Sequence, residues 1–274
     1  MTNHMNEATK ELTKTEVQLA AAREVLAATG KSPRQLGQES RIKVINWIYR
    51  WGYSSSSIIQ DLLGRTSAGY AHKLMKQGWL VATKTISGAP EVIFTLSELG
   101  LQEAERYSGD LYRYPDLDPY KVNQLQIRHY LLAQSTTINA INSGTIVDFE
   151  TERMFSQVAD APRIKRPDIV WLTQSKRRFA IEIELSKKWD RDLDTFIFTI
   201  LKALHSSKRK AARFDRFIVF TESPAIMNTY QQSMQPGSKL NIWRKNKRGH
   251  WFIARTIKVP SWLIGKVDFK LIKR

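Results

Sequence analysis

Three acidic residues fall in two neighbouring segments whose apolar residues alternate as in β-strands. Asp168 lies near the start of the first segment, residues 166–173, and Glu182 and Glu184 lie two positions apart in the second, residues 178–185. Because side chains two apart in a strand share a face, Glu182 and Glu184 would lie side by side, with Asp168 on the partner strand. Neighbouring carboxylates in an apolar hairpin are costly unless a cation lies between them. Three carboxylates around one point suit Mg²⁺ or Mn²⁺, so Asp168, Glu182 and Glu184 are the predicted metal ligands.

Such a site predicts metal-assisted phosphodiester cleavage, which also needs a cation to stabilise the developing charge. Lys187 and Lys188 follow Glu184 within four residues, and Lys188 shares the strand parity of the two glutamates. Either lysine could fill that role. Glu150 and Glu152 end an earlier predicted strand, and either could add a carboxylate. For all these glutamates the alternative interpretation is a solvated sheet edge.

Other catalytic motifs are absent from the sequence. The chain has no Cys, which excludes a cysteine nucleophile and thiolate-bound zinc and fits a reducing compartment. Its five His never form a close pair, and no Gly-x-Ser-x-Gly occurs. Gly64 and Gly69 have P-loop spacing, but Tyr70 and Ala71 follow where Lys and Ser or Thr are needed. His129, among apolar residues of a predicted helix, is expected to be a packed core histidine.

The acidic segments belong to a succession of helices and strands that indicates an α/β domain. The hydrophobic periodicity predicts helices over residues 123–142, 190–204 and 225–232, strands over residues 145–150, 166–173, 178–185 and 216–221, and two further β elements at residues 240–244 and 251–254.

The chain ahead of this domain predicts a winged helix-turn-helix. Three helices are expected over residues 42–51, 54–63 and 66–77, the third capped by Thr66, and two β-prone runs at residues 79–86 and 92–96 follow. In that fold the third helix enters the major groove of DNA. A protein-interaction module is the alternative. The side chains expected to contact DNA are Arg65, Thr66, Ser67, Tyr70, His72, Lys73 and Lys76.

The charge is distributed unevenly between these two parts. The chain carries 43 Lys and Arg against 26 Asp and Glu, a net charge of +17, and all of this excess falls after residue 162. Basic clusters in a folded, aromatic-rich segment are typical of a surface that binds a polyanion, here DNA, although a solvated basic surface would look similar. The cluster Lys208, Arg209 and Lys210 is expected to contact DNA.

These patterns divide the chain into an N-terminal helical extension and linker (residues 1–39), a winged helix-turn-helix (40–108), a linker (109–122) and a basic domain (123–274). The longest uncharged run contains several amides and hydroxyls, so no membrane span or membrane insertion is expected. With no secretion signal visible, the expected location is the cytoplasm.

The acidic hairpin resembles the PD-(D/E)xK nuclease superfamily. The resemblance lies in Pro167-Asp168, a short hairpin and Glu182-x-Glu184, and it implies an αβββαβ core. Glu184 stands where the superfamily usually has Lys, and Lys187 or Lys188 would then supply the displaced lysine. The expected fold class is therefore α/β (α+β), a winged helix-turn-helix followed by a nuclease-like domain.

A narrower resemblance is to the replication–relaxation family, which includes MOBC-type plasmid relaxases. It rests on Leu125-x3-His129-x-Leu131, on residues 149–153, on Arg166-Pro167-Asp168 and on residues 182–188. This resemblance implies that Asp168, Glu182 and Glu184 bind the metal, with Glu152 and Lys188 in support. It also implies that the nucleophile is water or a tyrosine, for which Tyr112, Tyr114, Tyr120 and Tyr130 are candidates.

The function expected from the resemblance is a relaxase-like endonuclease that nicks one DNA strand at a plasmid origin of transfer (mobilization, conjugation) or replication. It would bind the duplex and the nicked single strand, with accessory relaxosome proteins as further partners. Two alternatives stay open. One is a non-catalytic DNA-binding regulator or replication initiator on a degenerate nuclease fold, and the other is a defence or restriction nuclease.

Overall fold

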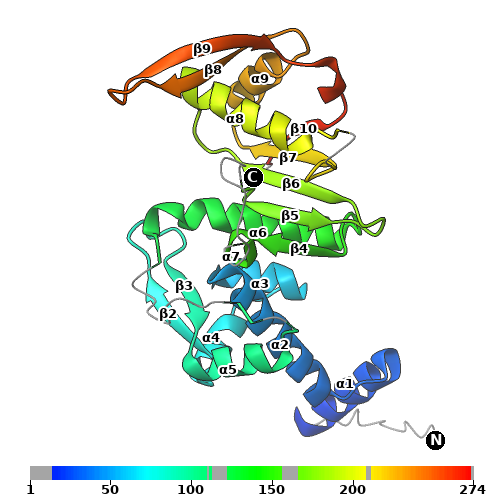
Figure 1. The fold of residues 1–274 in the computed structure, drawn as a ribbon. Helices are drawn as coiled ribbons and strands as arrows, with labels where there is room; N and C mark the ends of the chain where they lie inside the picture. Colours follow the sequence, from blue (N-terminus) through cyan, green and yellow to red (C-terminus); the bar gives the residue numbers. More distant parts are fainter. Residues whose placement is uncertain (1–13, 110, 113–121, 156–165, 208–210, 273–274) are drawn as a thin grey trace, which may run out of the picture.

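The computed structural model describes residues 14–109, 111–112, 122–155, 166–207 and 211–272. Within these residues the chain forms a helical N-terminal module, a central five-stranded sheet covered by helices, and a two-stranded hairpin at the far end (Figure 1). No helix among the described residues has the length and apolar character needed to cross a membrane.

The N-terminal module contains the predicted order of three helices followed by a β-ribbon. The module also contains a three-stranded antiparallel sheet of order β1-β3-β2, in which both β1 and β2 pair with β3. The elements are α1 (Lys14–Thr29), α2 (Pro33–Trp51), β1 (Ser54–Ser55), α3 (Ser56–Leu63), α4 (Tyr70–Lys76), β2 (Leu80–Lys84), β3 (Val92–Leu96) and α5 (Glu98–Tyr107).

Helix α2 begins earlier than the sequence analysis predicts. The linker expected at the end of residues 1–39 lies mostly inside the helix, which starts at Pro33. A capping box explains this start, because Ser32 accepts from the backbone N–H of Gln35 and the Gln35 side chain accepts from the backbone N–H of Ser32. The helix ends at Gly52, whose φ of 91° favours glycine.

Helix α4 begins later than predicted. Thr66 does not cap it, and the helix starts at Tyr70 after Gly69, with no side-chain cap. The buried Tyr70 and Ala71 explain this start, since they anchor the first turn in the core. Arg65, Thr66 and Ser67 therefore lie in the loop that precedes the helix.

The second part of the chain has the predicted order helix, three strands, helix, strand, in a mixed α/β architecture, with one unpredicted four-residue helix after the first strand. Strands β4, β5 and β6 pair antiparallel, β7 runs parallel to β6, and β10, which the sequence analysis missed, adds parallel to β7. The elements are η2 (Gln124–Gln126), α6 (Ile127–Asn142), β4 (Asp148–Thr151), α7 (Glu152–Phe155), β5 (Ile169–Leu172), β6 (Arg178–Ile183), α8 (Asp190–Leu204), β7 (Arg216–Thr221), α9 (Pro224–Ser233), β8 (Lys239–Lys245), β9 (Trp251–Lys258), η3 (Ser261–Leu263) and β10 (Val267–Leu271).

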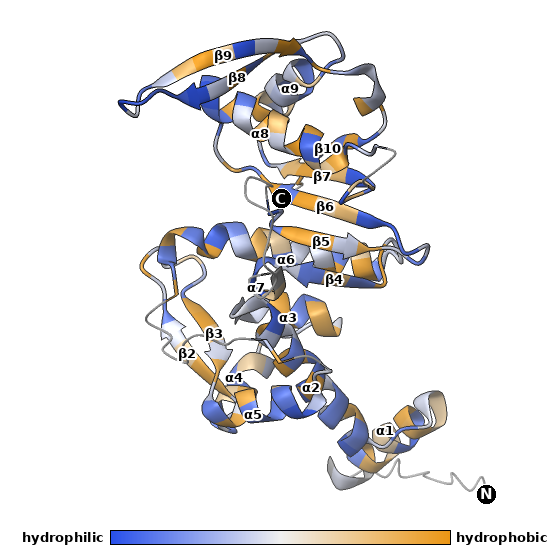
Figure 2. Ribbon diagram, in the orientation of Figure 1, coloured by the Kyte–Doolittle hydropathy of each residue, from blue (hydrophilic) through white to orange (hydrophobic). Residues whose placement is uncertain are grey.

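Both faces of the central sheet are buried, and alternate residues of β6 divide between them. Ile181 and Ile183 pack toward α6 and the N-terminal module, whereas Ala180 packs toward α8 and α9. The apolar residues of β5–β7 therefore lie between two helical layers (Figures 1 and 2). Glu182 and Glu184, which have the parity of Ala180, belong to the face toward α8 and α9.

The N-terminal module and the central sheet share one hydrophobic core. Trp47 of α2 lies with its ring centroid 5.2 Å from that of Phe149 in β4, and both side chains are buried. The fully buried Gln134 of α6 accepts from Trp47 Nε1 at 2.8 Å and donates to the Tyr53 carbonyl at 2.9 Å. These contacts fix the module against the sheet.

Candidate functional site at one edge of the central sheet

Four of the five strands of the central sheet have an acidic residue next to the same edge of the sheet. Glu152 follows β4, Asp168 precedes β5, Glu184 follows β6 and Glu222 follows β7. Since β4, β6 and β7 run in one direction and β5 in the other, these ends meet at the same edge. The sequence analysis anticipated three of the four acids, and Glu222 was missed.

Asp168 is held in place by two donors. Its Oδ2 accepts from the backbone N–H of Ile183 at 2.8 Å, and Nε2 of His129 lies 3.1 Å from the same oxygen. The backbone N–H of Asp168 donates to the carbonyl of Ile181 at 3.1 Å. The carboxylate therefore faces the end of β6, where Glu184 begins the next segment.

His129 lies beside this carboxylate, in contrast to the packed core position that the sequence analysis expected. Burial lowers the pKa of His129, but the bond to Asp168, the charge of that carboxylate and a bond to the backbone of Ile183 together raise the pKa above its ordinary value. About a quarter of its side chain is exposed. The imidazole is thus poised to carry a proton at this edge.

Glu184 is buried, with 5% of its side chain exposed, and Lys188 supplies its counter-ion. Nζ of Lys188 contacts both carboxylate oxygens of Glu184. The backbone N–H of Lys188 donates to Oη of Tyr230 at 3.0 Å, and burial next to Glu184 raises the pKa of Tyr230. Lys187 instead lies with Nζ 3.8 Å from the ring centroid of Trp189. Of the two lysines, Lys188 is the one that meets the acidic edge.

Glu182 lies one step deeper on the same face and is 1% exposed. The burial of Glu182 and Glu184 excludes the solvated sheet edge that was the alternative interpretation for this pair. A carboxylate this deep is stable only with nearby compensating charge or hydrogen bonds, so placing Glu182 two residues from the buried Glu184 costs folding free energy.

Glu150 of β4 and Glu152, which follows β4, have different surroundings. Glu152 accepts from Oη of Tyr130 at 2.7 Å, and burial together with this carboxylate raises the pKa of Tyr130. Glu150 pairs with Nη2 of Arg178 at 2.7 Å, at the start of β6. Glu152 therefore belongs to the acidic edge, whereas Glu150 is paired with a residue at the opposite end of β6.

Three consecutive residues at the start of α6 each contact a different acid of this edge. Arg128 pairs with Glu222, His129 lies 3.1 Å from Asp168, and Tyr130 donates to Glu152. Sequence reasoning missed Arg128, and it singled out Tyr130 only as one of four possible nucleophiles. Tyr114 and Tyr120 lie outside the described residues, and Tyr112 packs against Tyr49 of α2.

The carboxylates of this edge have the donor chemistry of a Mg²⁺ or Mn²⁺ site, since all offer hard oxygens. Among the described residues, however, no three His, Asp or Glu side chains are gathered closely enough to hold an ion. Lys188 and His129 occupy two of the carboxylates that the ion would use. The metal ligands Asp168, Glu182 and Glu184 stay a prediction.

The side chains expected to contact DNA lie on α4 and in the loop that precedes it. Arg65, Thr66, Ser67, Lys73 and Lys76 are exposed. Tyr70 is 8% exposed, its Oη lies 3.3 Å from the Gly37 carbonyl oxygen, and the Arg65 guanidinium lies 4.1 Å from its ring centroid. Lys208, Arg209 and Lys210 lie outside the described residues.

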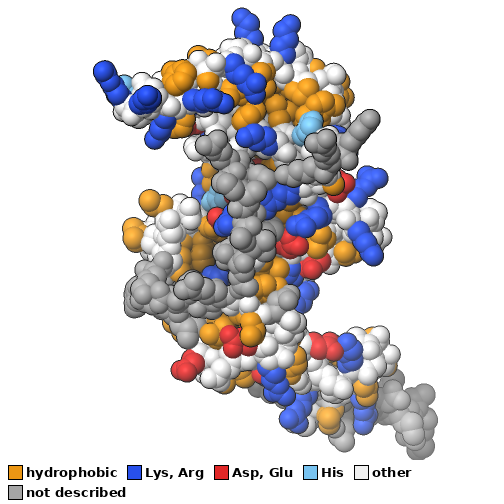
Figure 3. All heavy atoms as spheres, in the orientation of Figure 1, with side chains coloured by type: hydrophobic (Ala, Val, Ile, Leu, Met, Phe, Trp, Pro, Cys, Tyr) orange, Lys and Arg blue, Asp and Glu red, His pale blue; other side chains and the backbone are white. Residues whose placement is uncertain are grey.

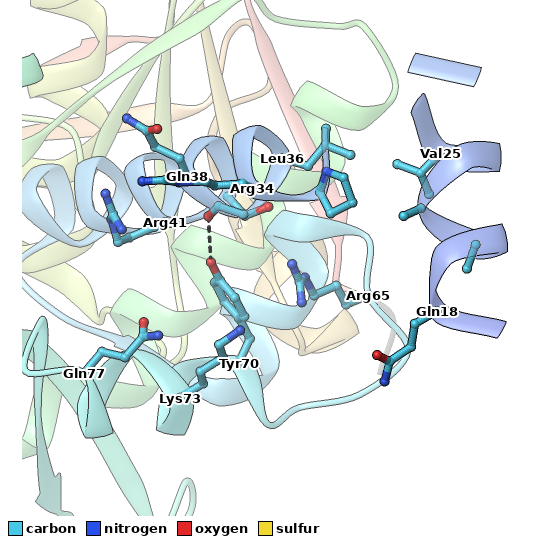
Figure 4. Close-up of a pocket in the computed structure, with 15 residues that line it drawn as sticks. Gln18, Val25, Arg34, Leu36, Gln38, Arg41, Arg65, Tyr70, Lys73 and Gln77 are labelled. Carbon is cyan, nitrogen blue, oxygen red and sulfur yellow. Dashed lines mark hydrogen bonds between the residues drawn. The ribbon is translucent and has the colours of Figure 1, made fainter. Parts of the chain in front are cut away.

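Arg65, Tyr70 and Lys73 border a hollow between α1, α2 and α4 (Figure 4). Its volume is about 990 Å³. Gln18 and Val25 of α1 form its far side. This helix therefore lies close to the face of α4 that is expected to meet DNA.

No family model and no curated protein matches the chain. Among solved structures, a transcriptional regulator from Thermotoga maritima is similar over 46% of this chain and 82% of that one, with 14% sequence identity and a TM-score of 0.21. A likeness at that TM-score carries no argument about the function of this chain.

Proposed function

We propose that this protein binds DNA through its N-terminal module, as a winged helix-turn-helix, together with its basic C-terminal part. For the C-terminal part the observation that carries the proposal is the charge distribution, since residues 163–274 hold the whole net charge of +17. Residues 1–162 are neutral overall, and for the N-terminal module the support is its order of helices followed by a β-ribbon. The exposed Lys73 and Lys76 on α4 would contact phosphates, and the shared core would hold the two surfaces at a fixed spacing.

The test of DNA binding is the salt dependence of affinity for a labelled duplex, measured by fluorescence anisotropy. We expect affinity to fall steeply between about 50 and 200 mM salt, because bound phosphates release counterions. Lys73→Gln with Lys76→Gln should reduce the slope by about 2. The matched pair Arg23→Gln with Lys31→Gln should leave the slope unchanged. Affinity that does not vary with salt would refute the proposal.

A second candidate function is cleavage of the bound strand at the acidic edge. It is favoured by the burial of Glu182 and Glu184 beside Lys188 and by the helix, three-strand, helix, strand order that the resemblance to PD-(D/E)xK nucleases implies. A protein that only binds DNA gains nothing from carboxylates buried in a basic domain, and they cost stability. In its specific form, this second candidate is a relaxase-like activity that nicks one DNA strand at a plasmid origin.

In this mechanism Asp168, Glu182 and Glu184 would hold Mg²⁺ or Mn²⁺, which would neutralise negative charge on the scissile phosphate. Lys188, once released from Glu184, would place its ammonium near the developing charge. His129 would hold Asp168 in orientation and carry a proton at its Nε2. Glu152 would keep Tyr130 oriented at the same edge.

The test of cleavage uses supercoiled plasmids with and without the native origin, in the presence of Mg²⁺ or Mn²⁺. We expect open circles only from the origin plasmid, lost in Glu182→Gln and retained in the control Glu150→Gln, whose side chain pairs with Arg178. Linear products from every plasmid would indicate a defence nuclease. DNA binding without any cleavage would refute this second candidate and favour a regulator or replication initiator.

A further inference from the structure

A long stretch of the C-terminal part contains no acidic residue. Between Glu222 and Asp268 the sequence has no Asp or Glu, and the β8–β9 hairpin, residues 239–258, lies inside this stretch. The basic residues of the hairpin are Lys239, Arg244, Lys245, Lys247, Arg248, Arg255 and Lys258. Side chains of one sign repel one another, so this arrangement points to an anionic ligand.

The base of the hairpin is firmly attached to the domain. Leu240 and Ile242 are buried in the core formed with α8 and α9. Nε1 of Trp243 donates to Oδ2 of Asp194 in α8 at 2.8 Å. The two strands form a separate sheet, and a register irregularity lies between Ile242 and Trp243. The outer half of the hairpin is therefore held rigidly away from the central sheet (Figure 1).

The outer half exposes aromatic and apolar side chains. Trp251 is 46% exposed, Phe252 45% and Ile253 48%. Figure 3 shows basic side chains gathered at the tip of this arm, beside apolar side chains on the same end of the molecule. Adjacent exposed apolar residues on a structural element are a common sign of a binding surface.

Each exposed aromatic residue has a basic residue as its partner on the opposite strand. Trp251 pairs with Lys245, and Phe252 pairs with Arg244. Nζ of Lys245 lies 5.1 Å from the ring centroid of Trp251, and the Arg191 guanidinium of α8 lies 4.8 Å from the same ring. Because Trp251 and Phe252 are consecutive in β9, they lie on opposite faces of the hairpin, and each face of the arm presents an aromatic ring beside a cation.

We propose that the outer half of the β8–β9 hairpin is a binding site for single-stranded DNA. A strand that wraps around the arm would stack its bases on Trp251 on one face and on Phe252 on the other, and its phosphates would lie against Arg244, Lys247 and Arg248. Single strands are the expected ligand because stacking on aromatic side chains requires unpaired bases. A lipid surface would instead favour apolar and charged residues on separate faces. This inference rests on the proposed DNA binding and adds the form of DNA and the surface that binds it.

The test compares the affinity of the full-length protein for an oligothymidylate and for a duplex of the same length. Trp251→Ala with Phe252→Ala should weaken binding of the single strand about tenfold or more, and should change duplex binding far less. Both side chains are about half exposed, so the fold should be kept, which thermal unfolding checks.

The charges are tested separately through the salt dependence of oligothymidylate binding. Arg244→Gln, Lys247→Gln and Arg248→Gln together should reduce the slope by about 2, since each phosphate contact on a single strand contributes about 0.7. The control set Arg23→Gln, Lys31→Gln and Lys43→Gln removes the same charge from exposed positions of the N-terminal module. It should leave the slope unchanged.

The outcomes separate this inference from the proposed function. Single-strand binding and salt slope unchanged in both hairpin variants would overturn the inference and leave DNA binding intact. Loss of duplex and single-strand binding alike would also overturn it, because the surface would then not distinguish bases. A hairpin variant that loses only its binding to phosphatidylserine vesicles would assign the arm to a lipid surface. A wild-type protein that binds no DNA would refute the proposed function itself.

Discussion

Replacing Gln134 by Leu should sharply destabilise the protein, because this amide joins the N-terminal module to helix α6 of the second part. Gln134 is fully buried in α6. Its Oε1 accepts from Trp47 Nε1 and from Ser54 Oγ, both at 2.8 Å, and its Nε2 donates to the Tyr53 carbonyl at 2.9 Å. Leucine has nearly the same volume, so the substitution removes polar partners without opening a large cavity.

The size of the effect follows from the groups left behind. The indole N–H of Trp47, the hydroxyl of Ser54 and the carbonyl of Tyr53 all lose a partner, and each buried group without a partner costs about 1–3 kcal/mol. The Ser54 hydroxyl can rotate, which lowers its share. A total of about 3–5 kcal/mol is expected, a large fraction of the roughly 5–15 kcal/mol that stabilises a folded protein.

Urea unfolding followed by tryptophan fluorescence and by far-UV circular dichroism measures this loss. The control is Gln231→Leu, an exposed position of α9, which should change the free energy of unfolding by less than about 0.5 kcal/mol. If Gln134→Leu costs less than about 1 kcal/mol, the amide does not bridge the two parts. Separate transitions for the two probes in the wild-type protein would refute the shared core.

Three further predictions concern buried groups. The Tyr53 hydroxyl is buried without a hydrogen-bond partner among the described residues, and burial raises the pKa of Tyr53, so Tyr53→Phe should stabilise by about 1 kcal/mol. Because the folded protein keeps this proton while the unfolded chain loses it above about pH 10, the stability of the wild-type protein should fall there with rising pH, and that of the variant should fall less. Equal slopes of unfolding free energy against pH in the two proteins would contradict this. Lys188→Met leaves the buried Glu184 without its cation and should lower the free energy of unfolding by about 3 kcal/mol. Adding Glu184→Gln should restore most of this stability. An unchanged free energy of unfolding in Lys188→Met would mean that the pair contributes nothing. Gly100→Ala would place a Cβ 2.2 Å from the Trp79 carbonyl oxygen, so thermal unfolding should show destabilisation of about 1–3 kcal/mol, against the gain expected from helix propensity alone.

The order of elements could be predicted from the sequence because most helices and strands carry their own hydrophobic period. The misplaced boundaries have local causes. The start of α2 depends on a capping box at Ser32 and Gln35 within a polar segment that looks like a linker. The start of α4 depends on the burial of Tyr70 in a core formed by distant residues. Strand β10 was missed because it is short and only partly buried, and it is defined by pairing with β7.

The acidic residues of the candidate site could be predicted because strand parity places Glu182 and Glu184 on one face. Their partners could not. Tyr230 reaches this edge from α9, more than 40 residues along the chain, and only the packing of that helix on the sheet brings its hydroxyl to the backbone of Lys188. For His129 the apolar neighbours in sequence favour a core position, and the nearness of Asp168 depends on how α6 crosses the sheet.

The first turn of α6 explains how this edge can hold so many carboxylates. Its residues in order meet acids in the order of the strands: Arg128 at β7, His129 between β6 and β5, and Tyr130 at β4. These three side chains differ in charge, since arginine stays protonated, tyrosine stays neutral and histidine titrates. Among the described residues the acids of this edge outnumber the permanent cations that pair with them, Arg128 and Lys188, so these groups together are negative inside a strongly positive domain. A cation bound at this edge would therefore be favoured by the local carboxylates, while the surrounding basic surface would attract the DNA strand toward it.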